Sequence, residues 1–158
     1  MRSLFAGWRI ELIERKKENG CIFCKFPAEN NDEKNHIIKR GKFSFIILNA
    51  YPYSNGHLMV VPYAHKSSLD ELTDDEALEM FEMKKMAINA IKKAMNPDGF
   101  NIGMNLGSEV SGAGIPGHIH WHIVPRWRGD HNFMAVIADT RVIPEALAST
   151  YKKIKQFL

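Results

Sequence analysis

The alternation of apolar and polar positions predicts its clearest helix directly after Thr73. Thr73 and Glu76 form a capping-box pair, and Asp74 and Asp75 suit the positive end of a helix dipole. Apolar residues then recur at helical spacing and predict one buried face, formed by Leu78, Phe81, Ile88, Ile91 and Met95. Asn and Pro at positions 96 and 97 end this helix, since proline disfavours its continuation.

Two further helices are predicted near the ends of the chain. Residues 9–19 form one and stop at Gly20, a typical helix-ending residue, and residues 144–157 form a closing helix. Residues 27–35 are polar and rich in turn formers, which predicts a surface loop. Residues 49–56 contain too many helix and strand breakers for regular structure.

Short apolar runs bounded by turn residues predict five strands, over residues 36–39, 43–48, 57–61, 100–105 and 119–124. Arg40 and Gly41 suggest a tight turn between the first two. Strands outnumber helices and do not alternate with them one for one, which indicates an α+β fold. We therefore expect a mainly antiparallel sheet of about five strands, with a long helix and a C-terminal helix packed on it. No internal repeat or linker divides residues 1–158, so one domain is expected.

Composition places the chain among ordinary soluble proteins, with 45% hydrophobic and 25% charged residues. The net charge of +3 is too small to indicate a nucleic-acid partner and weakly suits a phosphate-bearing substrate. The first 20 residues lack a continuous apolar core, so they resemble neither a signal peptide nor a membrane span. The only cysteines, Cys21 and Cys24, provide no secreted disulfide framework, which favours a cytoplasmic protein.

The stretch GHIHWHIVPRW, from Gly117 to Trp127, places His118, His120 and His122 at every second position. On a strand these three side chains would share one face, with Cβ atoms roughly 6–7 Å apart. Three imidazoles in a row on a flat strand do not easily converge on one ion, because zinc needs nitrogen at roughly 2.0–2.1 Å. The spacing favours a division of roles, over a three-histidine catalytic zinc site or a purely structural row of histidines.

The glycine-rich run NLGSEVSGAGIPG leads directly into these histidines. Its glycines allow backbone conformations in which several amide N–H groups face one point, and such nests bind phosphate. Many such runs are plain loops, but here a histidine cluster follows. Phosphate chemistry with a histidine nucleophile needs an imidazole to attack phosphorus and donors for the oxygens that gain charge.

With these motifs the chain resembles the histidine triad family, whose signature is histidine–apolar–histidine–apolar–histidine followed by two apolar residues. The resemblance extends over nearly the whole chain, through GWR, GCIFC, NAYPYSNGHLMVVPYAH, DGFNIGMNLG and PRWRGDHNFMAVIADTRVIPEAL. The NAYPY segment and the long tail look most like the dinucleoside polyphosphate hydrolases and diadenosine tetraphosphate phosphorylases, and less like the shorter nucleoside phosphoramidases. The resemblance implies a single triad domain over residues 1–158, with N-terminal and C-terminal extensions.

The resemblance also implies roles for individual residues. His120 matches the nucleophile that forms a nucleotidyl-histidine intermediate at the α-phosphorus, and His122 matches the histidine near the phosphate and leaving group. His57 matches a supporting histidine on a neighbouring strand. Asn49 matches the position that binds the ribose hydroxyls, and Asn105 matches a polar residue near the α-phosphate.

The phosphate loop departs from the family pattern. Many relatives carry Gly-Gln shortly before the first histidine, whereas residues 112–115 here are Gly-Ala-Gly-Ile. A glutamine donor to phosphate is therefore missing, which leaves the loop contacts open. We expect backbone amides or hydroxyl groups to replace it, from Gly107, Ser108, Ser111 and Gly114.

The Cys-x-x-Cys pair has three interpretations from its residues alone: a redox pair, half of a structural zinc site, or two unrelated buried thiols. A redox role would fit a thioredoxin-like strand–helix unit, for which the sequence shows no pattern. In zinc-containing triad proteins these cysteines join two histidines, which match His65 and His118 here. The resemblance thus implies a closed structural site of Cys21, Cys24, His65 and His118, the donor set zinc favours.

The resemblance implies an enzyme that cleaves dinucleoside polyphosphates, such as diadenosine tetraphosphate or triphosphate, at the α-phosphate. Water would resolve the intermediate in a hydrolase and phosphate in a phosphorylase. The alternatives are a non-catalytic nucleotide-binding or signalling module, a nucleoside phosphoramidase, and a zinc hydrolase with a metal-bound water. Structural zinc is expected, a magnesium–substrate complex is compatible with the scheme, and the partners are a small-molecule nucleotide and a second copy in a homodimer. No nucleic-acid or membrane partner is expected.

Overall fold

The computed structural model describes residues 20–107, 111, 115, 117–130 and 142–158. The helix predicted over residues 9–19 lies outside these residues, as do Ser108 and Gly114 of the predicted phosphate loop. Within the described part of the chain, no helix is both long and apolar enough to cross a membrane.

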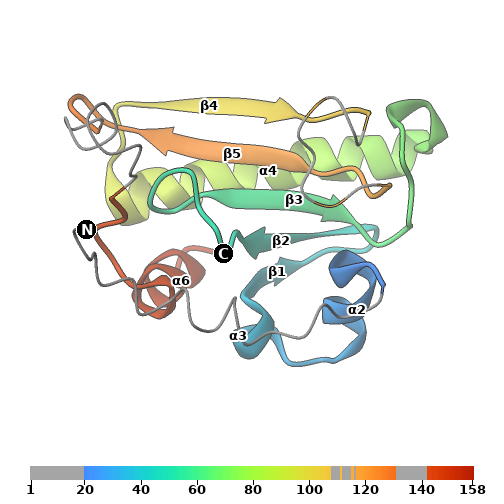
Figure 1. Ribbon diagram of the computed structural model, residues 1–158, viewed down its shortest axis with the longest axis horizontal. Helices are drawn as coiled ribbons and strands as arrows, with labels where there is room; N and C mark the ends of the chain where they lie inside the picture. Colours follow the sequence, from blue (N-terminus) through green and yellow to red (C-terminus); the bar gives the residue numbers. More distant parts are fainter. Residues whose placement is uncertain (1–19, 108–110, 112–114, 116, 131–141) are drawn as a thin grey trace, which may run out of the picture.

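The fold is built on one five-stranded sheet, in which each pair of neighbouring strands is antiparallel. The strand order is β1-β2-β3-β5-β4 (Figure 1). The strands are β1 (Ile37–Arg40), β2 (Ser44–Leu48), β3 (Leu58–Pro62), β4 (Gly99–Met104) and β5 (Trp121–Arg126). Each expected strand is present, with bounds shifted by no more than two residues. The α+β prediction is confirmed.

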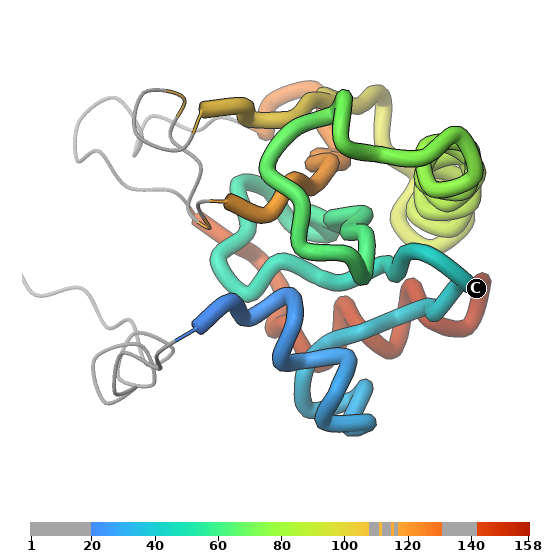
Figure 2. The backbone as a smooth tube through the Cα atoms, turned by 90° about the vertical axis from the view of Figure 1, so that its right-hand side faces the viewer, coloured from blue at the N-terminus to red at the C-terminus, as the bar shows by residue number. Residues whose placement is uncertain are grey.

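Helices cover the two faces of the sheet unequally. The long helix α4 (Asp74–Met95) and the closing helix α6 (Leu147–Lys155) pack in one hydrophobic cluster with alternate residues of β2 and β3. The opposite face carries a smaller cluster around Phe23 of α2 (Ile22–Ala28). Figure 2 views the strands end-on, with α4 and α2 on different sides of the sheet. The described residues also form α3 (Asp32–Asn35) and the short 3₁₀ helix η1 (Leu69–Glu71).

Helix α4 begins as predicted but buries only part of the predicted face. The capping box of Thr73 and Glu76 is present in both directions. However, Leu78 and Phe81 are 62% and 55% exposed. The buried stripe is formed by the predicted Ile91 together with Met80, Met83, Ala87 and Ala90, and the predicted Ile88 and Met95 pack partly buried against the same cluster. The prediction of the buried face was therefore partly wrong, because the two methionines and two alanines pack on the sheet and turn the larger side chains outward.

The predicted loop over residues 27–35 was also wrong, since α2 and α3 occupy most of that segment. Both helices are too short to show an apolar period in the sequence. Asn31 caps α3, where its side chain accepts a hydrogen bond from the Lys34 amide. The buried Asn35 then donates to the carbonyl of Phe26, which joins the two helices.

Candidate functional site

The three histidines of GHIHWHIVPRW lie together at the start of β5. Only His122 belongs to the strand, because β5 begins at Trp121 and His118 and His120 precede it. The His118 and His120 rings both pack against the ring of Phe23, at centroid distances of 5.4 and 4.9 Å. The His120 and His122 rings are 4.7 Å apart. All three imidazoles therefore gather on the face that α2 covers, even though the strand begins two residues later than expected.

The protonation of His120 is set by the backbone of its neighbour. Nδ1 of His120 lies 2.9 Å from the carbonyl oxygen of His118. A carbonyl only accepts hydrogen bonds, so Nδ1 carries the proton and Nε2 keeps its lone pair. Burial lowers the pKa of His120, although the hydrogen bond to the His118 carbonyl opposes this effect. His120 is thus a neutral imidazole with an unprotonated Nε2, the state required of a nucleophile.

His57 links the backbone of Tyr53 to His122 through a hydrogen bond at each of its ring nitrogens. The backbone N–H of Tyr53 donates to Nδ1 of His57 at 3.1 Å, and the Asn49 side-chain nitrogen lies 3.2 Å from the same atom. Because Nδ1 accepts, Nε2 of His57 carries the proton. That atom lies 2.9 Å from Nδ1 of His122 and donates to it. The relay therefore runs from Tyr53 through His57 to His122.

This relay leaves His122 with a proton on Nε2. Nε2 is buried and has no hydrogen-bond partner within the described ranges. Burial, and then the neighbouring His120, lower the pKa of His122 to about 4, so the ring is neutral at physiological pH. An unsatisfied buried donor costs about 1–3 kcal/mol, which makes it a marker for a ligand oxygen. The site thus places an N–H donor beside the unprotonated nitrogen of His120.

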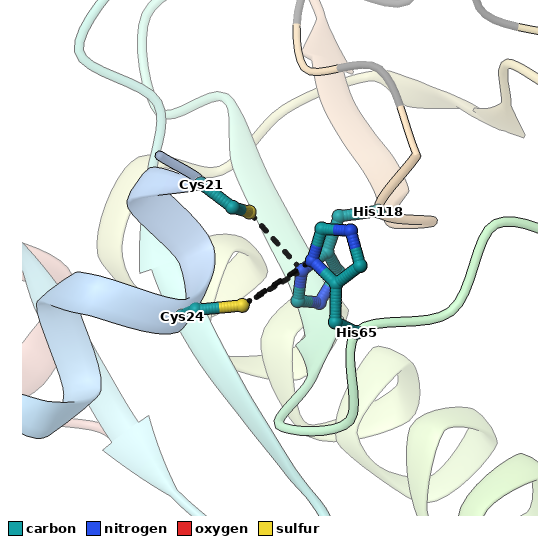
Figure 3. A group of neighbouring side chains, drawn as sticks. All are labelled: Cys21, Cys24, His65 and His118. Carbon is teal, nitrogen blue, oxygen red and sulfur yellow. Dashed lines mark hydrogen bonds between the residues drawn. The ribbon is translucent and has the colours of Figure 1, made fainter. Parts of the chain in front are cut away.

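A second cluster lies next to the first and consists of Cys21, Cys24, His65 and His118. One ligand atom from each side chain lies within 4.8 Å of all the others. Figure 3 shows Cys21 at the N-terminal end of α2 and Cys24 in its first turn, with His65 on the loop after β3 and His118 ahead of β5. The closest pairs are Cys21 Sγ to His118 Nδ1, at 3.2 Å, and Cys24 Sγ to His65 Nδ1, at 3.3 Å.

The donor set and its spacing fit a tetrahedral zinc ion. A tetrahedron with bonds of about 2.0–2.3 Å has edges of about 3.3–3.8 Å, close to these separations. Nε2 of His118 lies 2.9 Å from the carbonyl oxygen of Pro62, so it is the protonated nitrogen and Nδ1 is free to bind metal. Without a metal, burial raises the pKa of the Cys24 thiol, as do its hydrogen bond to Cys21 and the charge there. A bound cation would have the opposite effect and lower the pKa of the thiol, because it stabilises the thiolate.

Comparison with known proteins identifies the family. A model of the HIT domain matches residues 30–129, which is more than half of the chain. The chain belongs to the HIT family. Among its relatives is an AP-4-A phosphorylase from Mycobacterium tuberculosis, 46% identical over 128 residues. The match covers 81% of this chain, which spans only 65% of the length of that relative.

Two further likenesses place this HIT protein among its relatives. An asymmetrical bis(5'-nucleosyl)-tetraphosphatase from Schizosaccharomyces pombe is 31% identical over 108 residues, covering 68% of this chain and 56% of that protein. The crystal structure of a Zn-bound histidine triad family protein from Mycobacterium smegmatis superposes with a TM-score of 0.70 at 23% identity. It covers 87% of this chain and 92% of that one. The structural likeness confirms the HIT fold.

The remaining predicted substrate-binding residues lie at two places around the HIT histidines. Asn49 follows β2 and accepts from the Tyr51 amide through its side-chain oxygen, while its nitrogen faces His57. Asn105 and Gly107 follow β4 and line a cavity of about 270 Å³. The other residues lining this cavity are Ser67, Ile115, Gly117, His118 and Ile119. The fold thus brings Asn105 and Gly107 beside the first triad histidine.

Sequence reasoning missed two contributors to this site. Tyr53 acts through its backbone N–H, and its ring packs against His57 with a centroid distance of 4.6 Å. The backbone carbonyl of Lys66 accepts a hydrogen bond from the Ile119 amide at 2.8 Å, and the Lys66 side chain pairs with Glu76 at 2.5 Å. Neither residue belongs to a sequence motif. Tyr53 acts through its backbone N–H, and Lys66 acts through contacts with residues elsewhere in the chain.

Proposed function

We propose that this HIT protein is an enzyme that cleaves dinucleoside polyphosphates at an α-phosphate. The observation that carries the proposal is the different protonation of two neighbouring rings, whose centroids are 4.7 Å apart. Nε2 of His120 has a lone pair, whereas Nε2 of His122 carries a proton. Such a pair supplies a nucleophile and a hydrogen-bond donor to the same phosphorus centre. The names of the two relatives, a phosphorylase and a tetraphosphatase, support this substrate class.

In the proposed reaction, Nε2 of His120 forms a bond to the α-phosphorus. The bond from that phosphorus to the bridging oxygen breaks, and the electron pair leaves with the departing nucleotide. The Nε2–H of His122 donates to the phosphate or the leaving oxygen, which stabilises the charge that develops. An oxygen of water or inorganic phosphate then attacks the same phosphorus, the phosphorus–nitrogen bond breaks, and His120 is regenerated.

The phosphate groups need further donors, and we propose that residues after β4 supply them. We assign Asn105 and Gly107 to this role, with Ser108 and Gly114 as candidates from the adjoining loop, and Asn49 to the ribose hydroxyls. A magnesium–substrate complex is compatible with the scheme, in which no protein side chain has to bind that ion.

Cys21, Cys24, His65 and His118 would hold a structural zinc ion. Bound there, zinc would supply a crosslink and no open coordination site for chemistry. These four side chains come from α2, from the loop after β3 and from the segment before β5. The set would tie three separate segments together directly beside His120. Such thiolate ligands suit the reducing cytoplasm, where we place the enzyme.

The proposal includes a homodimer that forms at the β4 edge of the sheet. Strand β4 is an edge strand, and the side chain of Ile102 on this strand is exposed. On the neighbouring helix α4, Leu78 and Phe81 are also exposed. The Lys84 ammonium group lies 4.9 Å from the Phe81 ring centre and 3.5 Å from that of Trp121 in β5. An open strand edge beside an apolar surface is the arrangement that a second copy would cover.

One experiment tests the activity and separates its variants. Diadenosine tetraphosphate is supplied with and without inorganic phosphate, and the products are identified by chromatography. AMP and ATP indicate hydrolysis, whereas ADP and ATP formed only with phosphate indicate phosphorolysis. Binding of the substrate without turnover under both conditions would contradict the proposal and favour a nucleotide-binding module.

A further inference from the structure

A polar network joins the loop before β3 to the C-terminal part of the chain. Its members are Asn55, Glu145 and Thr150. The Asn55 nitrogen donates to Glu145 at 3.1 Å, and the Thr150 hydroxyl lies 3.0 Å from the Asn55 oxygen and 2.8 Å from Glu145. Lys153 closes the network with a 2.5 Å contact to the other Glu145 oxygen. Thr150 is fully buried, so its hydroxyl group has to be satisfied inside the protein.

The same loop sets the proton positions of the histidine relay. Tyr53 lies two residues before Asn55 and donates its backbone N–H to Nδ1 of His57. The His57 amide in turn donates to the Ser54 carbonyl at 3.2 Å. Gly56 between them has a φ of +77°, and a Cβ there would lie 2.7 Å from Met95 Sδ. The loop is therefore held on one side by His57 and on the other by α6.

We propose that Asn55 and Thr150 are positioning residues for the HIT histidines. By fastening the loop to α6, they keep the Tyr53 amide against His57 and so place the proton of His122 on Nε2. The kinetic part of this inference rests on the proposed function, whereas the proton position does not. Neither residue touches the histidines, and the network acts only through the loop.

The consequence of losing the network follows from the direction of the relay. If the Tyr53 amide moves away, Nδ1 of His57 loses a donor that fixes it as the acceptor. The Asn49 nitrogen still lies 3.2 Å from that atom, so the hydrogen bond between His57 and His122 reverses in only a fraction of the molecules. In that fraction the His122 proton lies on Nδ1. Nε2 of His122 would no longer donate to a phosphate oxygen, and the donor function described above would be lost.

The test uses two variants of the full chain, Thr150→Val and Asn55→Ala. Thr150→Val removes the hydroxyl group, and Asn55→Ala removes the partner of that hydroxyl group on the loop. Asn55→Ala still tests the inference if Thr150→Val does not fold. Side-chain ¹⁵N NMR of the histidines distinguishes protonated from unprotonated ring nitrogens. In the wild type we expect the proton of His122 on Nε2, and in both variants a mixture that includes the Nδ1 form.

The kinetic readout is the turnover of diadenosine tetraphosphate. Both variants should lower kcat about tenfold or more, with KM changed much less, because losing one hydrogen-bond donor to the charge that develops in the transition state costs about 10²–10³-fold. Thr150→Ser, which keeps the hydroxyl, should restore most of kcat. Ile154→Val is the matched control, since it removes a buried methyl group from α6 outside the network. It should lower stability and leave both kcat and the His122 proton unchanged.

Two results would overturn the inference. One is a His122 proton that stays on Nε2 in both variants. The other is an Ile154→Val protein that loses as much kcat as Thr150→Val at equal stability. A wild-type protein that fails to cleave any dinucleoside polyphosphate would instead refute the proposed function, and the NMR comparison would still decide the positioning role.

Discussion

The carbonyl oxygen of His118 accepts a 2.9 Å hydrogen bond from Nδ1 of His120. His118 therefore contributes to both clusters, through its ring to the cysteine and histidine set and through its backbone to the proposed nucleophile. Any movement of His118 changes the acceptor that orients His120 and fixes its proton. Structural integrity of the metal site and reactivity of the nucleophile are coupled through this one residue.

The first prediction concerns the nucleophile. His120→Asn should lower turnover of diadenosine tetraphosphate by about three orders of magnitude or more, because no other group replaces the attacking nitrogen. Mass spectrometry of quenched reactions should detect a nucleotidyl adduct on the wild type and none on the variant. Near-normal turnover by a folded His120→Asn protein would refute the assignment.

The second prediction concerns the metal. Elemental analysis should find about one zinc per chain, and Cys24→Ser should lose it. Chelation should lower the midpoint of thermal unfolding by about 10 °C, if the ion contributes about 4 kcal/mol to the folded state. Activity should fall with the metal and return when zinc is restored, through the link from His118 to His120. A metal-free preparation that is fully folded and active would refute this prediction.

The third prediction concerns the turn between β1 and β2. The Glu79 carboxylate accepts hydrogen bonds from the backbone amides of Lys42, Phe43 and Ser44, and from the Ser44 hydroxyl. Burial of the carboxylate raises its pKa, but these hydrogen bonds outweigh that effect and lower the pKa.

Glu79→Ala should therefore lower the free energy of unfolding by about 3 kcal/mol, because buried donors lose a charged acceptor. Urea denaturation at neutral pH measures this change. Glu82→Ala is the control on the same helix, since the contact seen for Glu82 within the described residues is an exposed ion pair with Lys85. It should change stability by less than about 1 kcal/mol. Equal effects of the two substitutions would contradict the assigned role of Glu79.

The fourth prediction concerns acid stability. The pKa of His122 is about 4 in the folded protein, below the ordinary value of 6.5. Between these values the unfolded chain binds the additional proton, so the free energy of unfolding falls as the pH drops from about 6.5 to 4. The slope from this one group is at most about 1.4 kcal/mol per pH unit. The measurement is the difference in stability between wild type and His122→Asn across this range. If that difference does not vary with pH, His122 is not held neutral by burial.

The fifth prediction concerns assembly. Phe81→Asp and Ile102→Asp should each convert the dimer into a monomer in sedimentation velocity, because a charge would be buried in the proposed interface. Leu69→Asp provides the control, since Leu69 is an exposed apolar residue on η1, outside that surface. A wild-type protein that is monomeric at micromolar concentration would contradict the interface.

The sequence alone determined the features that depend on local spacing. The capping box of Thr73 and Glu76 set the start of α4 because both partners lie within one helical turn. The alternation of His118, His120 and His122 predicted a shared face, since an extended chain has a period of two. The breakers and apolar runs located all five strands within two residues, and the triad motif identified the family.

Tertiary structure decided everything that depends on contacts between distant segments. It chose the methionine and alanine stripe of α4 over Leu78 and Phe81, because burial follows the fit to the sheet and not apolarity alone. It brought His65 to the cysteines of α2, as the family resemblance implied. It also set the protons of the histidines, through a carbonyl at His118 and an amide at Tyr53. Backbone groups are the same in every residue, so no sequence pattern could have indicated which of them would face an imidazole.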